Sequence, residues 1–464
     1  MLGSLKIPGA GVKAAVFLAQ VLVGTGVVPV LSPTRHASTW IPVEVPHAAV
    51  VAVTCPSAGS CVAVGSYDEM GGHLHGLLAT FSRGTWAAAL APLPPNASPQ
   101  NPGDSYLSGV ACRGTGFCVA VGWYTSVSGD PHGLLETLAG GKWTPLQAPL
   151  PANVTLGSAA SLTAVACPSV RSCVAVGSYF DPRPAALGLI ETFSGGHWTA
   201  LQPRPPPNAN SAPDVFLQTV TCPAVGACVT VGSYNDTGGN IPGLIETLAH
   251  GTWIPTEVAR AAVFAVTCPS AGSCVAVGSV YGLRGQLHGL IETLSRGTWT
   301  GRQAPLPANA ATNRSPVLDA VTCPAVGSCI AVGAYTNAKR DHDGLIDALS
   351  GSIWRPAKLT LPAGVDAHHD ALTCVTAASC IAVGSYLDTS GTILHGLVET
   401  LSGGTWTTSR APLPTNAEGA NPVASFNDMT CPTPGTCVAV GWYRDTSGAT
   451  QGLIETPSEK GYPR

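Results

Sequence analysis

The sequence predicts an all-β protein built as an eight-bladed β-propeller with four-stranded blades. Eight cysteine pairs, all with C-x5-C spacing, recur at intervals of 46 to 57 residues. Each pair is followed by an Ala-Val-Gly or Thr-Val-Gly phrase, then mostly by a "GLIETL"-like segment and a tryptophan. No segment after residue 33 keeps a helical period. Four strand-like runs in a repeat of this length are typical of a propeller blade.

The third repeat illustrates the four strands expected in each blade. They are "LTAVAC" (162–167), "CVAVGSY" (173–179), "GLIETF" (188–193) and "HWTALQ" (197–202). These runs are short, rich in β-branched and aromatic residues, and bounded by Gly, Pro, Ser or Asn. The same order of four runs recurs along the chain, which predicts one antiparallel sheet per repeat.

The two ends of the repeat region predict how the ring closes. The eighth repeat ends without a tryptophan strand, whereas "STWIPVEVPHAAVVAVTC" (38–55) matches "GTWIPTEVARAAVFAVTC" (251–268), which is a fourth strand leading into the next blade. We therefore expect the strand around Trp40 to complete the last blade beside 452–457. Such a closure leaves no free sheet edge and fixes both ends of the ring.

The repeat phrase, C-V-A-V-G followed by L-I-E-T-L-x-G-G-x-W, resembles the BNR/Asp-box propeller repeats of sialidase-like and photosystem-assembly proteins. The resemblance covers roughly residues 38–457 and implies the propeller fold. The turns "LSRGTW" (294–299) and "LSGGTW" (401–406) keep the Ser, Gly, Thr and Trp of an Asp box but lack its Asp. The F/Y-R-I-P phrase of sialidases is absent as well, so the resemblance does not imply sialidase chemistry.

The cysteines predict one disulfide in each blade. Each pair flanks a five-residue turn between the first two strands, which places the two cysteines opposite one another. Zinc sites and dithiol redox sites both favour closer spacing than C-x5-C. Pairing between adjacent blades remains the alternative connectivity. The expected bonds are Cys55–Cys61, Cys112–Cys118, Cys167–Cys173, Cys222–Cys228, Cys268–Cys274, Cys323–Cys329, Cys374–Cys380 and Cys431–Cys437.

Composition bounds the class of protein. The chain has 464 residues, 10% of them charged, with a formal net charge of −4 and no run of Lys or Arg. Nucleic-acid binding depends on neutralising phosphates, so it is not expected here. The 54 glycines and 40 prolines, together with 45% hydrophobic residues, favour many short strands and turns.

The expected organisation has three parts. Residues 1–33 contain Lys6 and Lys13 before an apolar run from 14 to 32, which predicts an export signal or an uncleaved membrane anchor. Residues 34–458 form a single propeller, and 459–464 form a C-terminal tail. Together with the cysteine pairs, this predicts a secreted or cell-surface protein that contacts a membrane only through an uncleaved N-terminal segment.

Residues that recur in most blades are expected to be structural. A catalytic carboxylate would be needed once or as one pair. We therefore expect the recurring glutamates to hydrogen-bond to the backbone or to a neighbouring blade, and the recurring histidines and tryptophans to be structural too. These glutamates are Glu136, Glu191, Glu246, Glu292, Glu399 and Glu455, and the histidines are His75, His132, His288 and His395.

Breaks in the repeat are candidate binding positions. The residue after the Ala-Val-Gly phrase is Trp123 in the second blade and Trp442 in the eighth, and Ser or Ala elsewhere. Blades two and eight both flank blade one, so the two indoles could line one sector and stack on a glycan or another flat ligand face. The alternative is that they fill gaps between loops.

A second break supplies candidate metal-binding and catalytic residues. The segments "NAKRDHDG" (337–344) and "DAHHDAL" (366–372) concentrate carboxylates and imidazoles on the end of the ring that carries the variable loops. This mixture suits a divalent metal such as Zn or Mn, with Asp366, His342, His368 and His369 as ligands. Asp341, Asp343 and Asp370 are the candidate acid or base groups. The alternative is a set of solvated loop residues.

The expected function is that of an exported binding or scaffold module for a glycan, a cell-wall polymer or a protein partner. Two alternatives remain: a secreted polysaccharide hydrolase or lyase with its site on the variable loops, and a structural surface component. No nucleotide-binding, metalloprotease or nucleophile-elbow motif occurs in a fitting context, which favours a protein without catalysis but does not decide the matter.

Overall fold

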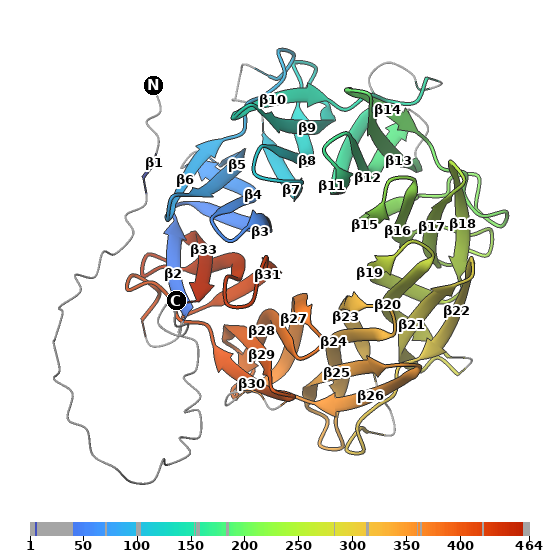
Figure 1. The fold of residues 1–464 in the computed structure, drawn as a ribbon, viewed down its shortest axis with the longest axis vertical. Helices are drawn as coiled ribbons and strands as arrows, with labels where there is room; N and C mark the ends of the chain where they lie inside the picture. The colour runs from blue at the N-terminus through green and yellow to red at the C-terminus, as the bar shows by residue number, and fades with distance from the viewer. Residues whose placement is uncertain are drawn as a thin grey trace, which may run out of the picture.

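The computed structural model describes residues 5–6 and 40–457, except for short gaps at 70–71, 99–103, 153, 155–157, 182–184, 283, 312–314, 360, 362–363 and 420–421. The described chain forms a ring of eight antiparallel sheets around a common centre (Figure 1). In each blade the first strand lies nearest the centre and the fourth lies at the perimeter. The eight-bladed propeller expected from the repeats is confirmed.

The first four blades follow one another along the chain, each with its strands in sequence order. Blade 1 contains β3 (Ala48–Ser57), β4 (Ser60–Glu69), β5 (His73–Ser82) and β6 (Thr85–Leu90), to which β1 (Leu5–Lys6) adds an antiparallel bridge. Blade 2 contains β7 (Ser105–Cys112), β8 (Phe117–Thr125), β9 (Pro131–Ala139) and β10 (Lys142–Gln147). Blade 3 contains β11 (Ala159–Ser169), β12 (Ser172–Asp181), β13 (Ala185–Ser194) and β14 (His197–Leu201). Blade 4 contains β15 (Phe216–Ala224), β16 (Ala227–Ser233), β17 (Gly243–Ala249) and β18 (Thr252–Val258).

The next three blades repeat this order, and the eighth takes its fourth strand from the N-terminal part of the chain. Blade 5 contains β19 (Ala261–Ser270), β20 (Ser273–Tyr281), β21 (Leu287–Ser295) and β22 (Thr298–Gln303). Blade 6 contains β23 (Val317–Ala325), β24 (Ser328–Thr336), β25 (His342–Ser350) and β26 (Ile353–Lys358). Blade 7 contains β27 (Gly364–Thr376), β28 (Ser379–Asp388), β29 (Leu394–Ser402) and β30 (Thr405–Arg410). Blade 8 contains β31 (Ala424–Thr430), β32 (Val438–Arg444), β33 (Thr450–Pro457) and β2 (Trp40–Val45).

The ring closes where the sequence match predicts. Strand β2 pairs antiparallel with β33, with Trp40 opposite Pro457 and Val45 opposite Gly452 (Figure 1). The last blade is therefore built from both ends of the described chain, so the ring cannot open there without breaking a sheet.

The disulfides of all eight blades form within the blade, as expected. The two cysteines of each pair have Cα atoms 4.0–4.1 Å apart, and no cysteine is free. In blades 2 and 7 they are direct partners in the strand register. Strand pairing continues past the cysteines in most blades, which explains why strands such as β11 are longer than the runs read from the sequence.

A β-bulge recurs on the innermost strand of every blade. The extra residue opens the strand locally and lets its side chain reach the next blade. Thr163 Oγ1 donates to the Leu217 carbonyl at 2.7 Å, and Asn427 Nδ2 donates to the Val50 carbonyl at 2.8 Å. The bulge residues are Val51, Ser108, Thr163, Gln218, Phe264, Asp319, Asp370 and Asn427.

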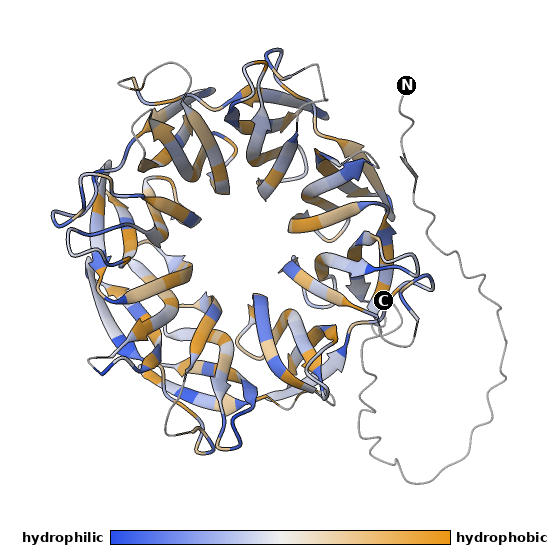
Figure 2. Cartoon of the chain, turned by 180° about the vertical axis from the view of Figure 1, so that it is seen from behind, coloured by the Kyte–Doolittle hydropathy of each residue, from blue (hydrophilic) through white to orange (hydrophobic). Residues whose placement is uncertain are grey.

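The hydrophobic core lies between neighbouring blades. Figure 2 shows hydrophobic residues mainly along the strands and hydrophilic residues on the loops. Trp86 of blade 1 is buried in a cluster with Val438 and Ile454 of blade 8. Trp299 Nε1 donates to Thr247 Oγ1 of the preceding blade at 3.0 Å. The expectation that the recurring tryptophans are structural is confirmed at these two positions, where they pack between blades.

The N-terminal expectations fall on residues that the structure does not describe. The predicted export signal or anchor, 1–33, lies outside the described residues apart from Leu5–Lys6, and the predicted tail, 459–464, lies outside them entirely. Among the described residues there is no helix of the length and hydrophobicity needed to cross a membrane.

Candidate functional site

The two ends of the ring differ in how regular they are. One end carries the C-x5-C hairpins and the Gly-rich turns, which repeat with little change. The other end, which we call the variable face, carries the loops between second and third strands and the connections between blades. These connections range from two residues between β18 and β19 to fourteen between β6 and β7. Variation on a rigid scaffold makes this face the place to search for a site.

A Tyr–Asn clasp fastens the long connections of the variable face. In blade 4, the Tyr234 hydroxyl donates to Asn208 Oδ1 at 2.8 Å, and Asn208 Nδ2 donates to Glu257 Oε2 at 2.9 Å. The fully buried tyrosine directly follows the second strand, and the asparagine lies in the proline-rich connection between β14 and β15. The same arrangement joins Tyr124, Asn96 and Gln147 in blade 2, and Tyr443, Asn416 and Glu44 in blade 8.

Asp343, a predicted catalytic residue, belongs to the clasp of blade 6. Its Oδ2 atom accepts hydrogen bonds from Asn309 at 3.3 Å, Tyr335 at 3.3 Å and Asn337 at 3.0 Å. The same atom pairs with Lys358 Nζ at 2.8 Å. Lys358 occupies the fourth-strand position that holds Glu257 in blade 4, so Asp343 supplies the carboxylate that the clasp would otherwise lack. These four partners hold the Asp343 carboxylate in the clasp, and its catalytic role stays a prediction.

The neighbouring candidates Asp341 and His342 lie beside the same turn. Asn337 Nδ2 donates to Asp341 Oδ2 at 3.3 Å, and Asn337 Oδ1 accepts from the Asp341 backbone N–H at 3.1 Å. His342 is exposed at the start of β25. Asp341 therefore takes part in shaping the loop, and His342 faces solvent.

The second candidate segment is part of strand β27, which separates its side chains. His368 and Asp370 are exposed, whereas His369 between them is buried, and Asp366 is half-buried with a positive φ of 54°. Alternation along a strand sends adjacent side chains to opposite faces. In the part of the chain that the structure describes, no group of three or more His, Cys, Asp or Glu side chains is arranged to hold a metal ion. The structure does not bring the four predicted metal ligands together.

His369 forms a buried pair that the sequence analysis missed. Its Nε2 atom lies 2.9 Å from Glu399 Oε2, and both side chains are fully buried. Burial alone would lower the pKa of His369, but the charge of Glu399 and this hydrogen bond, together with the charges of Asp319 and Asp370, outweigh it and raise that pKa. One signal was present: the first-strand residue opposite the second-strand glycine is Val, Leu or Phe in the other seven blades and His only here.

The recurring third-strand carboxylates form what we call the carboxylate belt. The expectation that they hydrogen-bond is wrong for Glu136, Glu191, Glu246 and Glu455, because neither oxygen of any of them has a partner among the described residues. Asp347 occupies the same position in blade 6 and is also unpartnered. Burial raises the pKa of Glu136, Glu191 and Glu246 to about 8, so these acids are largely protonated at neutral pH.

Trp123 and Trp442 are half-buried on second strands. Trp123 shares its face of β8 with Val121, which packs against blade 3, and Trp442 shares its face of β32 with Val440, which packs against blade 1. The two indoles therefore belong to different seams, with blades 1 and 2 between them. The structure does not bring them into the common sector that their sequence positions suggested, and their role in binding stays a prediction.

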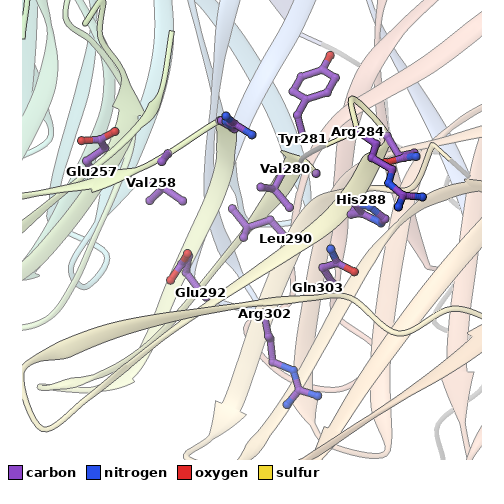
Figure 3. Close-up of a pocket in the computed structure, with 15 residues that line it drawn as sticks. Glu257, Val258, Val280, Tyr281, Arg284, His288, Leu290, Glu292, Arg302 and Gln303 are labelled. Carbon is purple, nitrogen blue, oxygen red and sulfur yellow. The ribbon is translucent and has the colours of Figure 1, made fainter. Parts of the chain in front are cut away.

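The variable face contains a cavity of about 710 Å³ at the seam of blades 4 and 5, open on one side to solvent (Figure 3). We call it the blade-5 cavity. Its size is that of a small-molecule site. The apolar wall is made by Val258, Ala259, Val280 and Leu290. The polar lining comes from Glu257, Arg260, Tyr281, Arg284, Gln286, His288, Glu292, Arg302 and Gln303.

The cavity exists because blade 5 departs from the repeat at three places. Its second strand has Val280 where the other seven blades have tyrosine. The connection that enters it consists of two residues, so no Asn-bearing loop covers the seam. Gly301 stands opposite Glu292, where other blades have Pro, Ala or Thr. A Cβ on Gly301 would clash with Glu292 Oε1, so the glycine makes room for the carboxylate.

Blade 1 provides a natural comparison, because a two-residue connection enters it as well. There Tyr67 is present, the His75 imidazole is buried and lies 3.1 Å from Glu69 Oε2, and the belt position holds Ala79. In blade 5 the counterpart of Glu69 is Gly282, and His288 makes no hydrogen bond with any described residue. The blade-5 cavity thus lies where Tyr67 and the His75–Glu69 pair stand in blade 1.

Glu292 is the belt carboxylate that this cavity reaches. Burial raises its pKa to about 7, and it remains 7% exposed whereas the other belt carboxylates are fully buried. In Figure 3 it points into the space below Val258, while Arg302 points away from it. Arg302 instead acts on Asp347 of blade 6, where its charge opposes the rise in pKa that burial causes. The cavity therefore contains a carboxylate that changes charge near neutral pH.

Comparison with known proteins gives distant structural likenesses only. No family model matches the chain, including any for Asp-box repeats, and no curated protein sequence matches it. The WD40 domain of SCAP from fission yeast has 8% identity and a TM-score of 0.46, covering 90% of this chain and 98% of that chain. The BP39L lectin from Burkholderia pseudomallei has 13% identity and a TM-score of 0.44, covering 79% and 100%. A puromycin hydrolase has 11% identity and a TM-score of 0.47, covering 85% and 58%. Likenesses this weak carry no argument about ligand or activity, and the chain's own strand register establishes the propeller.

Proposed function

We propose that the protein is an exported binding module whose ligand site is the blade-5 cavity. The observation that carries this proposal is the coincidence of three departures from the repeat at one seam: Val280, the two-residue connection and Gly301. Each removes bulk from the same place, and polar side chains line the open cavity that results. Eight disulfides support an oxidising environment outside the cytoplasm.

The ligand classes that we propose are those expected from the sequence: a glycan, a cell-wall polymer or a protein partner. Binding is favoured over catalysis because the groups around Asp343 are committed to the clasp of blade 6. Glu292, the belt acid in the cavity, occupies a position that recurs as a buried carboxylate in six other blades.

A cavity-filling variant tests this proposal. Val280→Tyr restores the side chain that the other blades carry and should fill the cavity without disturbing the fold. We expect wild type to bind a subset of a glycan and peptide array, and the variant to lose those signals while keeping its melting temperature. Ser279→Ala, a buried neighbour on the same strand, is the matched control and should bind as wild type does. Equal array signals for V280Y and wild type would exclude the cavity as the site.

One observation favours a hydrolase as the second candidate. Glu257 and Glu292 line the same cavity, and the raised pKa of Glu292 suits a general acid in glycoside hydrolysis. Turnover of an array ligand that Glu292→Gln abolishes, with binding retained, would establish this alternative. A protein that neither binds nor turns over any ligand would instead fit the structural surface component.

The two tryptophans provide a separate test of glycan stacking. Trp123→Ala and Trp442→Ala remove half-buried indoles from different seams, so each can be measured by itself. A loss of array signal in either variant, with V280Y unaffected, would move the proposed site from the blade-5 cavity to that seam.

A further inference from the structure

The blade-5 cavity carries unpaired positive charge at its mouth. Arg260 comes from the two-residue connection into blade 5, and Arg284 comes from the loop between β20 and β21. Both are exposed, and neither guanidinium has an ion pair or a hydrogen bond with a described residue. In a chain with only 22 Lys and Arg in 464 residues, two such groups from different loops at one opening favour an anionic ligand.

The backbone holds Arg260 at this opening. Its φ is 56°, in the left-handed region, and its carbonyl accepts a hydrogen bond from the Tyr281 N–H at 2.9 Å. His47 occupies the same position in blade 1, with a φ of 53° and a corresponding bond from Asp68 N–H at 2.7 Å. A non-glycine residue in this conformation fixes where the side chain leaves the turn. The arginine is therefore presented to the cavity by a defined turn rather than by a loose loop.

The rest of the lining suits a polar ring more than an extended apolar group. Tyr281 stands at the rim with 57% of its surface exposed, and its ring can stack on the apolar face of a sugar. Gln303 and His288 offer hydrogen bonds on the walls, and Glu292 lies at the floor (Figure 3). The apolar contribution comes from Val258, Ala259, Val280 and Leu290, which lie beside these polar groups as in a mixed small-molecule site.

Resting on the proposed function, we propose that the blade-5 cavity binds a hexuronate unit of an acidic polysaccharide. Arg260 and Arg284 bind the carboxylate of the sugar acid, Tyr281 stacks on its ring, and Gln303, His288 and Glu292 bind its hydroxyl groups. In this orientation the carboxylate of the sugar lies at the cationic mouth of the cavity, and the hydroxyl groups of the sugar lie toward the uncharged polar groups at its floor.

Glu292 makes this binding depend on pH. The charged and titratable groups that line the cavity with it are Glu257 from β18, Arg260 and Arg284 from the two loops, Tyr281 from β20, His288 from its own strand and Arg302 from β22. Below about pH 7 Glu292 is protonated and can donate to a hydroxyl, and the arginines of the lining outnumber its remaining carboxylate, Glu257. As pH rises through that value Glu292 becomes negative and repels the sugar carboxylate. Affinity should therefore be greatest in mildly acidic solution and fall above neutrality.

Calorimetric titration with trigalacturonate and its neutral counterpart, galactotriose, tests the ligand class. We expect wild type to bind trigalacturonate at pH 5.5 at least ten times more tightly than galactotriose, because a charge-assisted hydrogen bond contributes a factor of that order. Arg284→Gln should remove most of this preference. Arg296→Gln changes an exposed arginine in the turn at the opposite end of blade 5 and should leave it intact.

The pH arm uses Glu292→Gln, which keeps the size of the side chain and removes its titration. Wild-type affinity for trigalacturonate should fall several-fold between pH 5.5 and 8.5, whereas that of E292Q should stay nearly constant. His288→Asn is measured in parallel and should retain the pH dependence. If the pH dependence of binding disappeared in H288N but persisted in E292Q, Glu292 would not be the group that makes binding depend on pH.

The outcomes separate the ligand class from the proposed function. Equal affinity for trigalacturonate and galactotriose, or tighter binding of an acidic peptide of the same charge, would overturn the hexuronate while leaving a binding cavity in place. Binding of trigalacturonate that survives V280Y would overturn the site itself. Array ligands that V280Y abolishes, none of them uronates, would support the proposed function and exclude this ligand.

Discussion

His369 Nε2 lies 2.9 Å from Glu399 Oε2, and neither side chain reaches solvent. The belt carboxylate of blade 7 thus has a basic partner, because only this blade has a histidine at that level of its first strand. In the six other blades that have a belt carboxylate, the same first-strand position holds an apolar residue and burial raises the pKa of the acid. A buried carboxylate is therefore stabilised in two ways in this repeat: it is protonated, or it is paired with a histidine.

The first prediction concerns the titration of His369. In wild type its pKa lies above the ordinary value of 6.5, because Glu399, together with Asp319 and Asp370, outweighs burial. Glu399→Gln removes the largest of these charge effects and leaves the burial, so the pKa of His369 should fall. The stability contributed by the raised pKa is present below pH 6.5 and is lost as pH rises through the native value. NMR of the imidazole resonances checks the shift, and Glu191→Gln, in a distant blade, should leave His369 unchanged.

The second prediction concerns the pH dependence of stability. Belt acids such as Glu191 have a pKa of 4.5 when exposed and about 8 in the fold. Between these values the native state holds a proton that the unfolded state has lost, so the free energy of unfolding should fall as pH rises from about 4.5 to 8. Each group contributes a slope of about 1.4 kcal/mol per pH unit. The protein should therefore be more stable near pH 5 than near pH 8.

Glu191→Gln tests this slope without changing the size of the side chain. Urea unfolding at several pH values should show a shallower decline for E191Q than for wild type and a higher stability at pH 8. Glu69→Gln changes an acid that is largely exposed and is a control that should keep the wild-type slope. A wild-type stability that rises from pH 5 to pH 8 would contradict the assignment of protonated belt acids.

The third prediction concerns the Tyr–Asn clasp of blade 4. Asn208→Ala leaves the hydroxyl of the fully buried Tyr234 without its acceptor and frees the connection from Glu257. A buried polar group left unsatisfied costs about 1–3 kcal/mol. We expect a loss of that size in the free energy of unfolding and faster proteolysis of the 202–215 connection. Tyr281→Phe removes a hydroxyl that is exposed and makes no hydrogen bond with a described residue, so its effect should stay within about 0.5 kcal/mol.

The fourth prediction concerns closure of the ring. Trp40 is 6% exposed on β2 and packs in the cluster of blade 8 with Phe426, so Trp40→Ala should cost about 3–5 kcal/mol. Ile41 is the next residue on the same strand and is 48% exposed, so Ile41→Ala should cost far less. Thermal and urea unfolding compare the two. Equal effects would mean that β2 contributes to closure through its backbone pairing alone.

Much of the fold followed from the sequence because it depends on local and repeated features. The C-x5-C spacing determined a hairpin and its disulfide, since two cysteines flanking a five-residue turn have few other partners within reach. The match between 38–55 and 251–268 determined how the ring closes, because it identified a fourth strand without its own blade. The tryptophan strands and the apolar alternation determined where the blades pack.

What only the tertiary structure decided was which side chains meet. Residues 366–370 read as a cluster, yet strand β27 sends His369 into the core and its neighbours out of it. Nothing in the sequence marks Val280, Gly282 and Gly301 as part of a site. The tyrosine, the carboxylate and the Cβ that these positions lack leave a cavity only because three strands and a short connection come together there. Each repeat forms its own blade through contacts between residues that are close together in the sequence. The blade-5 cavity instead arises from side chains that are missing on several strands, and these strands come close together only when the ring is assembled.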